Sequence, residues 1–295
     1  MAKTIFRGVG TALITPFSAD GSVDYEKLKY LTEYQVIHGV NAIIACGTTG
    51  EKSTLRHEEH LKVIETIITT CAGRVPVVAG TGSNDTLYTL ELSEAAESMG
   101  ADALLMVTPY YNKTSQNGLI RHYEYVADRV NTPIILYNVP SRTGMDIKPE
   151  TYAKLCKHPN IVATKEANGN FSALAQTIAL CGDELDIYSG NDDQTVAMMA
   201  MGAKGVVSVF SNLAPKQMSD LCQKALNGDF VGATAMQSQY LDVMNNMFID
   251  VNPIPVKEAM NQIGLEVGEC RMPLFPASDG VKEKIHNALI KAELL

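Results

Sequence analysis

Short apolar runs alternate with longer amphipathic segments along most of the chain. Each run is four to six residues long and mostly lacks polar–apolar alternation, which is typical of a strand buried on both faces of a parallel sheet. Eight strands are predicted in this way, at 9–14, 42–46, 76–79, 103–107, 133–137, 161–165, 186–189 and 205–209.

The segments between these runs repeat their apolar residues every three or four positions, which is the period of a helix. They predict helices at 24–38, 57–70, 86–99, 118–130, 148–157, 171–181 and 193–201. We expect Asn84 to cap the helix at 86–99, because a short polar side chain there can accept the first free backbone N–H groups. The residues expected on its inward face are Leu87, Leu90, Ala95 and Met99.

After residue 209 the strand signal stops, and four further helices are predicted at 215–227, 230–247, 254–264 and 281–295. Eight strand–helix alternations favour a closed (β/α)₈ TIM barrel over an open doubly wound sheet. The first run is not followed by GxGxxG, which argues against a dinucleotide-binding fold. We therefore expect a barrel domain over residues 1–225 and a C-terminal helical domain over residues 226–295.

Composition and charge narrow the class of protein. The net charge of −9 and the lack of a basic stripe argue against nucleic acid and anionic membrane as partners. No apolar stretch approaches the roughly 20 residues of a membrane helix, and the first residues lack the apolar core of a signal peptide. The 6 cysteines lie far apart, without a CxxC pair or a Cys/His cluster. We expect a cytoplasmic protein with no disulfide and no structural metal.

The strand ends carry the candidate chemistry, because barrel enzymes place their active sites at the C-terminal ends of the strands. Lys165 ends the sixth strand, and a period of two places it on the same face as Ile161 and Ala163. Two interpretations fit this lysine. It either escapes to the rim and pairs with Glu166, or it is a nucleophilic amine that forms a Schiff base with a carbonyl substrate.

Two other strand ends carry polar motifs. The second strand leads into CGTTGE at 46–51, where a simple Gly/Thr turn and a small-anion site built on the Thr48 and Thr49 backbone both fit. No GK[ST] follows, so a nucleotide P-loop is not supported. The fifth strand ends at Tyr137, and Arg142 lies on the loop beyond it. That arginine is either a solvent-exposed surface side chain or a guanidinium that binds a substrate carboxylate through two hydrogen bonds.

The motifs CGTTGE, TPYYNK, YNVPSRTG, ATKEANGN and SGNDD bring an amine, a phenol, a hydroxyl pair and an arginine to one rim. In order and spacing, they resemble the 4-hydroxy-tetrahydrodipicolinate (dihydrodipicolinate) synthase family over essentially the whole chain. The resemblance implies a pyruvate-dependent Schiff-base aldolase on a (β/α)₈ barrel, with no metal and no organic cofactor. It also implies condensation of pyruvate with L-aspartate 4-semialdehyde, the committed step toward diaminopimelate and lysine.

For catalysis, the resemblance implies that Lys165 is the Schiff-base lysine and that Tyr137 donates and accepts protons beside it. Thr48 is similar to the middle member of a Tyr–Thr–Tyr relay. Tyr111 is similar to the far member, which the neighbouring subunit lends. The resemblance therefore implies a homo-oligomer, and we expect a tetramer built as a dimer of dimers.

For binding, the resemblance implies that the backbone at Thr48 and Thr49 holds the pyruvate carboxylate. Arg142 resembles the residue that binds the carboxylate of the semialdehyde at the mouth of the site. Gly190 and Val207 match positions that line the pocket.

The resemblance also bears on regulation. Lysine-inhibited members of the family bind L-lysine at the tight dimer interface, largely through the segment after GTTGE. The residues that match this pocket are His57, His60, Asn84 and Tyr110. Lys52 replaces a small residue and Tyr88 replaces an acidic one, so a bound lysine would lose a partner and meet a like charge. We expect an enzyme largely insensitive to L-lysine. The alternative is that the Lys52 side chain extends into solvent and does not repel the bound lysine.

Two other functions compete with this one. A sister aldolase, such as N-acetylneuraminate lyase or a 2-keto-3-deoxy sugar acid aldolase, shares the barrel, the lysine and the tyrosine. Sister aldolases generally lack the SRTG arginine and often have serine at the first hydroxyl position, so Thr48 and Arg142 favour the synthase. A catalytically inactive relative that binds a keto acid or serves as a scaffold would lack Lys165 or Tyr137, and both are present.

Overall fold

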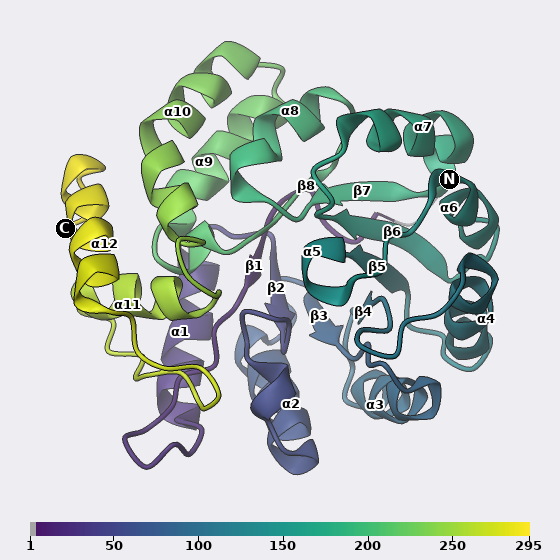
Figure 1. Cartoon of the computed structure of the whole chain (residues 1–295), viewed down its shortest axis with the longest axis horizontal. Coiled ribbons are helices and arrows are strands. Elements are labelled where there is room, and N and C mark those ends of the chain that lie inside the picture. The colour runs from purple at the N-terminus through teal and green to yellow at the C-terminus, as the bar shows by residue number, and fades with distance from the viewer. Residues whose placement is uncertain (1–3) are drawn as a thin grey trace.

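The computed structural model describes residues 4–295, and its central feature is a closed barrel of eight parallel strands (Figure 1). Each strand pairs with the next one in the chain, and β8 closes the barrel against β1. The strands are β1 (Gly8–Ala12), β2 (Ala42–Ala45), β3 (Val77–Gly80), β4 (Ala103–Val107), β5 (Ile134–Asn138), β6 (Ile161–Glu166), β7 (Asp186–Ser189) and β8 (Gly205–Ser208). The predicted (β/α)₈ barrel is confirmed, with each strand close to its expected range.

Helices surround the barrel, and the last of them, α9, packs against β1. The barrel helices are α1 (Tyr25–Ile37), α2 (His57–Cys71), α3 (Thr86–Ser98), α4 (Gln116–Ala127), α6 (Pro149–Leu155), α7 (Phe171–Cys181), α8 (Thr195–Ala200) and α9 (Pro215–Leu226). A single turn, α5 (Pro140–Thr143), lies in the loop after β5. The helix α9 therefore takes the place of the eighth barrel helix.

Three more helices, α10 (Phe230–Asn246), α11 (Ile254–Gln262) and α12 (Asp279–Lys291), lie beside α9 and α1 in Figure 1. The helix α10 packs on α8 and α9, and α12 packs on α10 and α11. Their buried residues belong to the same hydrophobic cluster as the residues between the strands and the barrel helices. The division at residues 225 and 226 stays a prediction.

The barrel interior holds a second apolar cluster, separate from the layer under the helices. Alternate strand residues point inward and fill it, including Ile44, Leu105, Tyr137 and Val207. The interior is therefore packed, and only the ends of the barrel offer room for chemistry.

The pairing of β5 with β6 corrects one predicted orientation. Ile134 lies opposite Ile161, but Ile135 lies opposite Ala163, so the register shifts by one residue between them. Ile161 consequently packs in the outer cluster, whereas Val162 and Ala163 both belong to the interior cluster. The expectation that Ile161 shares the face of Lys165 is wrong, because this irregularity interrupts the period of two.

The helix α3 corrects a second expectation. Asp85 caps it, not Asn84: its Oδ1 accepts hydrogen bonds from the N–H groups of Leu87 (2.8 Å) and Tyr88 (3.3 Å). Leu87 is 64% exposed instead of turned inward. The face that α3 buries consists of Thr89, Leu92, Ser93 and Ala96. Hydroxyl groups can be buried there because helix carbonyls accept their protons, as the Thr89 carbonyl does from Ser93 Oγ (2.6 Å).

Candidate active site

Lys165 and Tyr137 lie opposite each other at the carboxyl ends of β6 and β5. The Lys165 Nζ is 4.3 Å from the centroid of the Tyr137 ring, and both side chains are more than nine-tenths buried. A cation over an aromatic face is stabilised electrostatically. Lys165 therefore contacts the face of the Tyr137 ring, and this contact holds the amine at the inner wall of the barrel mouth.

Glu166 does not pair with Lys165, because consecutive strand residues point to opposite faces of the sheet. Its carboxylate accepts hydrogen bonds from Asn138 Nδ2 (3.1 Å), the Tyr152 hydroxyl (2.9 Å) and the Asn168 N–H (2.9 Å). Burial raises the pKa of Glu166 to about 7. The interpretation of Lys165 as half of a rim ion pair is thus not supported.

Gly190 lies directly after β7. Because it has no side chain, the aliphatic part of Lys165 can pass close to its backbone. A Cβ built at this position would lie 3.2 Å from Lys165 Cε and 2.7 Å from Ala167 Cβ. Its N–H donates to the Glu166 carbonyl at 2.8 Å, so the backbone is fixed at this close approach. A side chain at 190 would therefore clash with Ala167 and crowd the Lys165 side chain.

Asp192 is a buried carboxyl group near the amine that the sequence analysis did not single out. Its Oδ2 accepts hydrogen bonds from the N–H groups of Val209 (3.0 Å) and Phe210 (2.9 Å). Burial raises the pKa of Asp192, and the hydrogen bonds that it accepts from Ser208, Phe210 and Val209, followed by the charge on Lys165, oppose this shift. The signal available in the sequence was an acidic residue just beyond a strand end.

The loop after β2 carries Thr48 and Thr49. It is shaped by two left-handed residues, Cys46 and Glu51, each with φ of 53°. Within residues 4–295, the backbone N–H groups of Thr48 and Thr49 donate to no protein acceptor, which leaves them for a ligand. The Glu51 N–H closes the turn by donating to the Thr48 carbonyl at 3.0 Å.

The C-terminal segment anchors this loop through buried charges. Lys257 Nζ lies 2.6 Å from Glu51 Oε1, and both side chains are 2% exposed. The other carboxylate oxygen of Glu51 accepts a hydrogen bond from the Arg271 N–H at 2.9 Å. Burial lowers the pKa of Lys257, and Glu51 opposes that shift. Sequence reasoning missed this pair, because no local pattern connects positions 51 and 257.

A pocket of about 190 Å³ opens beside the same loop. Its lining includes Thr48, Lys52, Tyr110 and Arg142. Arg142 lies on α5 with its side chain exposed toward the mouth, and its Nη2 donates to the Asn252 carbonyl at 3.2 Å. The structure thus brings the predicted arginine and the predicted threonine to one pocket.

Tyr111 is the predicted site residue that does not join the others. Its side chain is 93% exposed, and its φ of 72° lies in the left-handed region. A non-glycine residue held there stores backbone strain on the order of 1–3 kcal/mol. The ring therefore lies almost entirely in solvent in the single chain.

Lys52 does not extend into solvent. Its Nζ donates to the carbonyl of Gly82, and burial lowers the pKa of Lys52 to about 8. Burial and the charge of Lys52 lower the pKa of His60 to about 4. Nearby, the Tyr88 hydroxyl lies 3.5 Å from His57 Nδ1. Contacts of Lys52 and Tyr88 thus connect this segment to the loop after β3 and to His57.

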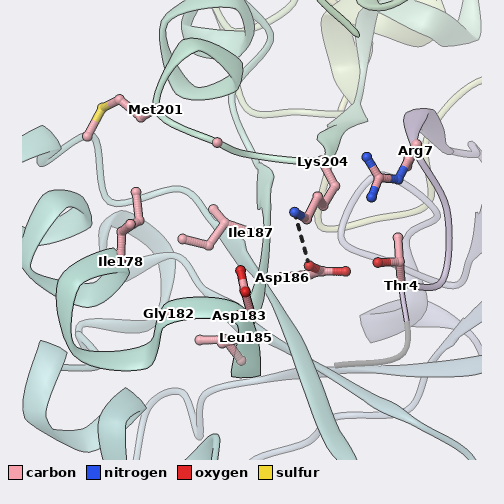
Figure 2. Close-up of a pocket in the computed structure, with 11 residues that line it drawn as sticks. Thr4, Arg7, Ile178, Gly182, Asp183, Leu185, Asp186, Ile187, Met201 and Lys204 are labelled. Atoms are coloured by element: carbon pink, nitrogen blue, oxygen red, sulfur yellow. Dashed lines mark ion pairs between the residues drawn. The ribbon is translucent and has the colours of Figure 1, made fainter. Parts of the chain in front are cut away.

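A larger pocket of about 380 Å³ lies at the opposite end of the barrel (Figure 2). Figure 2 shows Lys204 paired with Asp186, at 3.6 Å, with Arg7 and Thr4 beside them. Asp186 begins β7, so this pocket lies at the amino-terminal ends of the strands, away from Lys165. Barrel enzymes do not carry their chemistry at that end, so this larger pocket is not the candidate active site.

Between residues 4 and 295, no group of three or more His, Cys, Asp or Glu side chains is arranged to hold a metal ion. Nor does that part of the chain contain a helix that is long and apolar enough to cross a membrane.

The fold and this site define a (β/α)₈-barrel enzyme of the Schiff-base aldolase class, with a buried lysine at the carboxyl end of β6. The chain belongs to the dihydrodipicolinate synthetase family, whose model matches residues 5–292.

Individual relatives agree with this assignment. The 4-hydroxy-tetrahydrodipicolinate synthase of Clostridium novyi is 49% identical over 286 residues, which cover 97% of this chain and 96% of that protein. The crystal structure of chloride-inhibited dihydrodipicolinate synthase from Acinetobacter baumannii with pyruvate is 42% identical and has a TM-score of 0.97. It covers 99% of this chain and 100% of that one. A monomeric dihydrodipicolinate synthase variant, 41% identical, matches 99% of this chain and 98% of its own with a TM-score of 0.96.

Proposed function

We propose that this protein condenses pyruvate with L-aspartate 4-semialdehyde to give 4-hydroxy-tetrahydrodipicolinate. The observation that carries the proposal is the buried Lys165 amine, held over the Tyr137 ring at the barrel mouth of a chain from this family. The product is the first committed intermediate toward diaminopimelate and lysine.

The chemistry begins at Lys165. Its neutral amine attacks the C2 carbonyl of pyruvate, and loss of water gives an iminium. The iminium draws electrons from the methyl group, which then loses a proton to form an enamine. The enamine carbon adds to the aldehyde of the second substrate. The amino group of that substrate then attacks C2, closes the ring and releases Lys165. Tyr137 transfers protons in these steps, with Thr48 as the next member of the relay.

Two carboxylates must be held during this sequence. The free N–H groups of Thr48 and Thr49 fit the carboxylate of pyruvate, because backbone N–H groups in a turn form an anion-binding concavity. The guanidinium of Arg142 at the mouth fits the carboxylate of the semialdehyde. Gly190 and Val207 line the space between them.

The relay needs a third member, and we propose that Tyr111 of a neighbouring subunit supplies it. The exposed ring and the strained backbone of Tyr111 support this assignment, since neither is explained by contacts within residues 4–295 of one chain. The homo-oligomer would be a tetramer, arranged as a dimer of dimers.

A cytoplasmic location also stays a prediction, to be checked by cell fractionation.

Borohydride trapping with pyruvate tests the proposal. We expect one pyruvate-derived group on Lys165, found by peptide mass spectrometry, and no adduct on the Lys165→Ala variant. A coupled assay then compares aspartate semialdehyde with N-acetylneuraminate and 2-keto-3-deoxy sugar acids. An adduct on another lysine would refute the mechanism, and preferred turnover of a sugar acid would assign the chain to a sister aldolase.

A further inference from the structure

Asn252, in the segment between α10 and α11, touches both of the proposed carboxylate sites. Its side-chain Nδ2 donates a hydrogen bond to Thr49 Oγ1 at 3.0 Å. Its backbone carbonyl accepts a hydrogen bond from Arg142 Nη2 at 3.2 Å. The residue is 5% exposed, and its contact with Thr49 lies out of bulk water.

The direction of the first hydrogen bond determines what Thr49 can do. A hydroxyl group has one proton and two lone pairs. Because Thr49 Oγ1 accepts from Asn252, its single proton is left to donate elsewhere. The Oδ1 of Asn252 is buried and has no hydrogen-bond partner within residues 4–295, so it does not compete for that proton.

We propose that Asn252 is a positioning residue for pyruvate: it holds the Thr49 hydroxyl as an acceptor, so that the hydroxyl proton is directed to the substrate carboxylate. This inference rests on the proposed function. The backbone of Asn252 meanwhile holds Arg142 at the mouth, so one residue sets the spacing between the two carboxylate sites. Its side chain and its backbone therefore act on different substrates.

This separation makes the role testable. Asn252→Asp keeps the shape of the side chain but replaces the donor with an acceptor. Thr49 would then donate its proton to the new carboxylate, and the added negative charge would repel pyruvate. We expect the KM for pyruvate to rise about tenfold or more. The KM for the semialdehyde and the kcat should stay within about twofold, because the carbonyl that holds Arg142 is retained.

Four further variants complete the experiment: Asn252→Ala, Thr49→Val, the two combined, and Asn261→Asp. Asn252→Ala removes the donor without adding charge, and should raise the KM for pyruvate alone by a smaller factor. In a Thr49→Val background, Asn252→Ala should cause no further rise, because the hydroxyl it acts through is gone. Asn261→Asp makes the same chemical change on α11, where the amide contacts Gly268 and Val267, and should leave the KM for pyruvate unchanged.

The results separate this inference from the proposed function. An unchanged KM for pyruvate in both Asn252 variants, in a protein whose wild type forms the borohydride adduct, would overturn the positioning role and leave the function standing. A loss of thermal stability with equal rises in both KM values would also overturn it, in favour of a structural role. A wild-type protein that forms no pyruvate adduct would overturn both.

Discussion

The Lys165 Nζ lies over the face of Tyr137, and the two residues are direct partners in the register of β5 and β6. A ring face attracts a cation by about 0.5–2 kcal/mol, so the ring helps to hold the amine in this position. Attack on a carbonyl requires the neutral amine and is followed by several proton transfers. Tyr137 therefore offers both a ring that positions Lys165 and a phenol suited to proton transfer.

Tyr137→Phe should separate the ring from its hydroxyl. The cation–π contact remains, but proton transfer is lost, so we expect kcat to fall by about 10²–10⁴-fold. Borohydride should still trap pyruvate on Lys165, although more slowly. Tyr188→Phe is the matched control, because Tyr188 is the partner of Lys165 on β7 but donates its proton to the Phe6 carbonyl at 2.7 Å. A kcat loss in the control equal to that of Tyr137→Phe would contradict the assignment.

Arg142→Ala should impair the second substrate only. Loss of a charge-assisted hydrogen bond costs about 1.5–3 kcal/mol, so the KM for the semialdehyde should rise roughly tenfold or more. Pyruvate adduct formation should be nearly unchanged, because Arg142 lies at the mouth and not beside Lys165. Steady-state kinetics with each substrate varied in turn measure the difference. Equal damage to both substrates would assign Arg142 to the scaffold.

Tyr111 can be tested by mixing inactive variants. Tyr111→Phe subunits lack the third relay member, and Lys165→Ala subunits lack the amine. In a mixed oligomer, a Tyr111→Phe subunit keeps its own Lys165 and receives Tyr111 from its neighbour, so activity should reappear after unfolding and refolding together. Sedimentation of the wild type should show an oligomer. The proposal that Tyr111 acts in the site of a neighbouring subunit would be refuted if mixed oligomers recovered no activity. It would also be refuted if a wild-type monomer were fully active.

Glu166 should make stability depend on pH. Burial raises its pKa from 4.5 to about 7, so folding takes up a proton between these values and the free energy of unfolding falls as pH rises through this range. At 1.36 kcal/mol for each pKa unit, the loss is on the order of 3 kcal/mol. Glu166→Gln stays neutral, so urea unfolding at pH 5 and pH 8 should show a smaller fall than in the wild type. Parallel pH profiles would show that this carboxyl does not titrate as described.

L-lysine should inhibit weakly or not at all. The Lys52 ammonium is fixed by the Gly82 carbonyl, so it stays where it meets a bound lysine as a like charge. Tyr88 supplies no carboxylate to offset that repulsion. The test is an initial-rate titration with L-lysine at subsaturating pyruvate. Strong inhibition below about a millimolar would refute the prediction, since that affinity requires about 4 kcal/mol of favourable binding. Restored inhibition in Lys52→Ser with Tyr88→Glu would support it.

The barrel could be predicted because its signals are local. Eight mostly apolar runs, such as Ala103–Val107, are buried on both faces and can be recognised without knowledge of the neighbouring strands. The strand ends then indicated Lys165, Tyr137, Thr48 and Arg142, because a closed barrel brings all such ends to one rim. These expectations depend on order along the chain, which the sequence contains directly.

The residues that sequence reasoning missed depend on long-range contacts or on local irregularity. Asn252 and Lys257 reach the loop after β2 across about 200 positions, and neither belongs to a pattern that points there. Ile161 was placed on the wrong face because a register shift changes side-chain direction without changing composition. Leu87 was placed inward because hydropathy cannot show that buried hydroxyls, such as that of Ser93, are satisfied by the helix itself.

The anchoring of the loop after β2 by Asn252 and Lys257 also constrains synthesis of the protein on the ribosome. A nascent chain carries the threonines of the loop early, but it lacks both anchors until more than 250 residues have been joined. The loop can gain these two contacts only when the segment around residue 257 has left the exit tunnel. The completed form of this loop, near the start of the barrel sequence, therefore belongs to the last stage of synthesis.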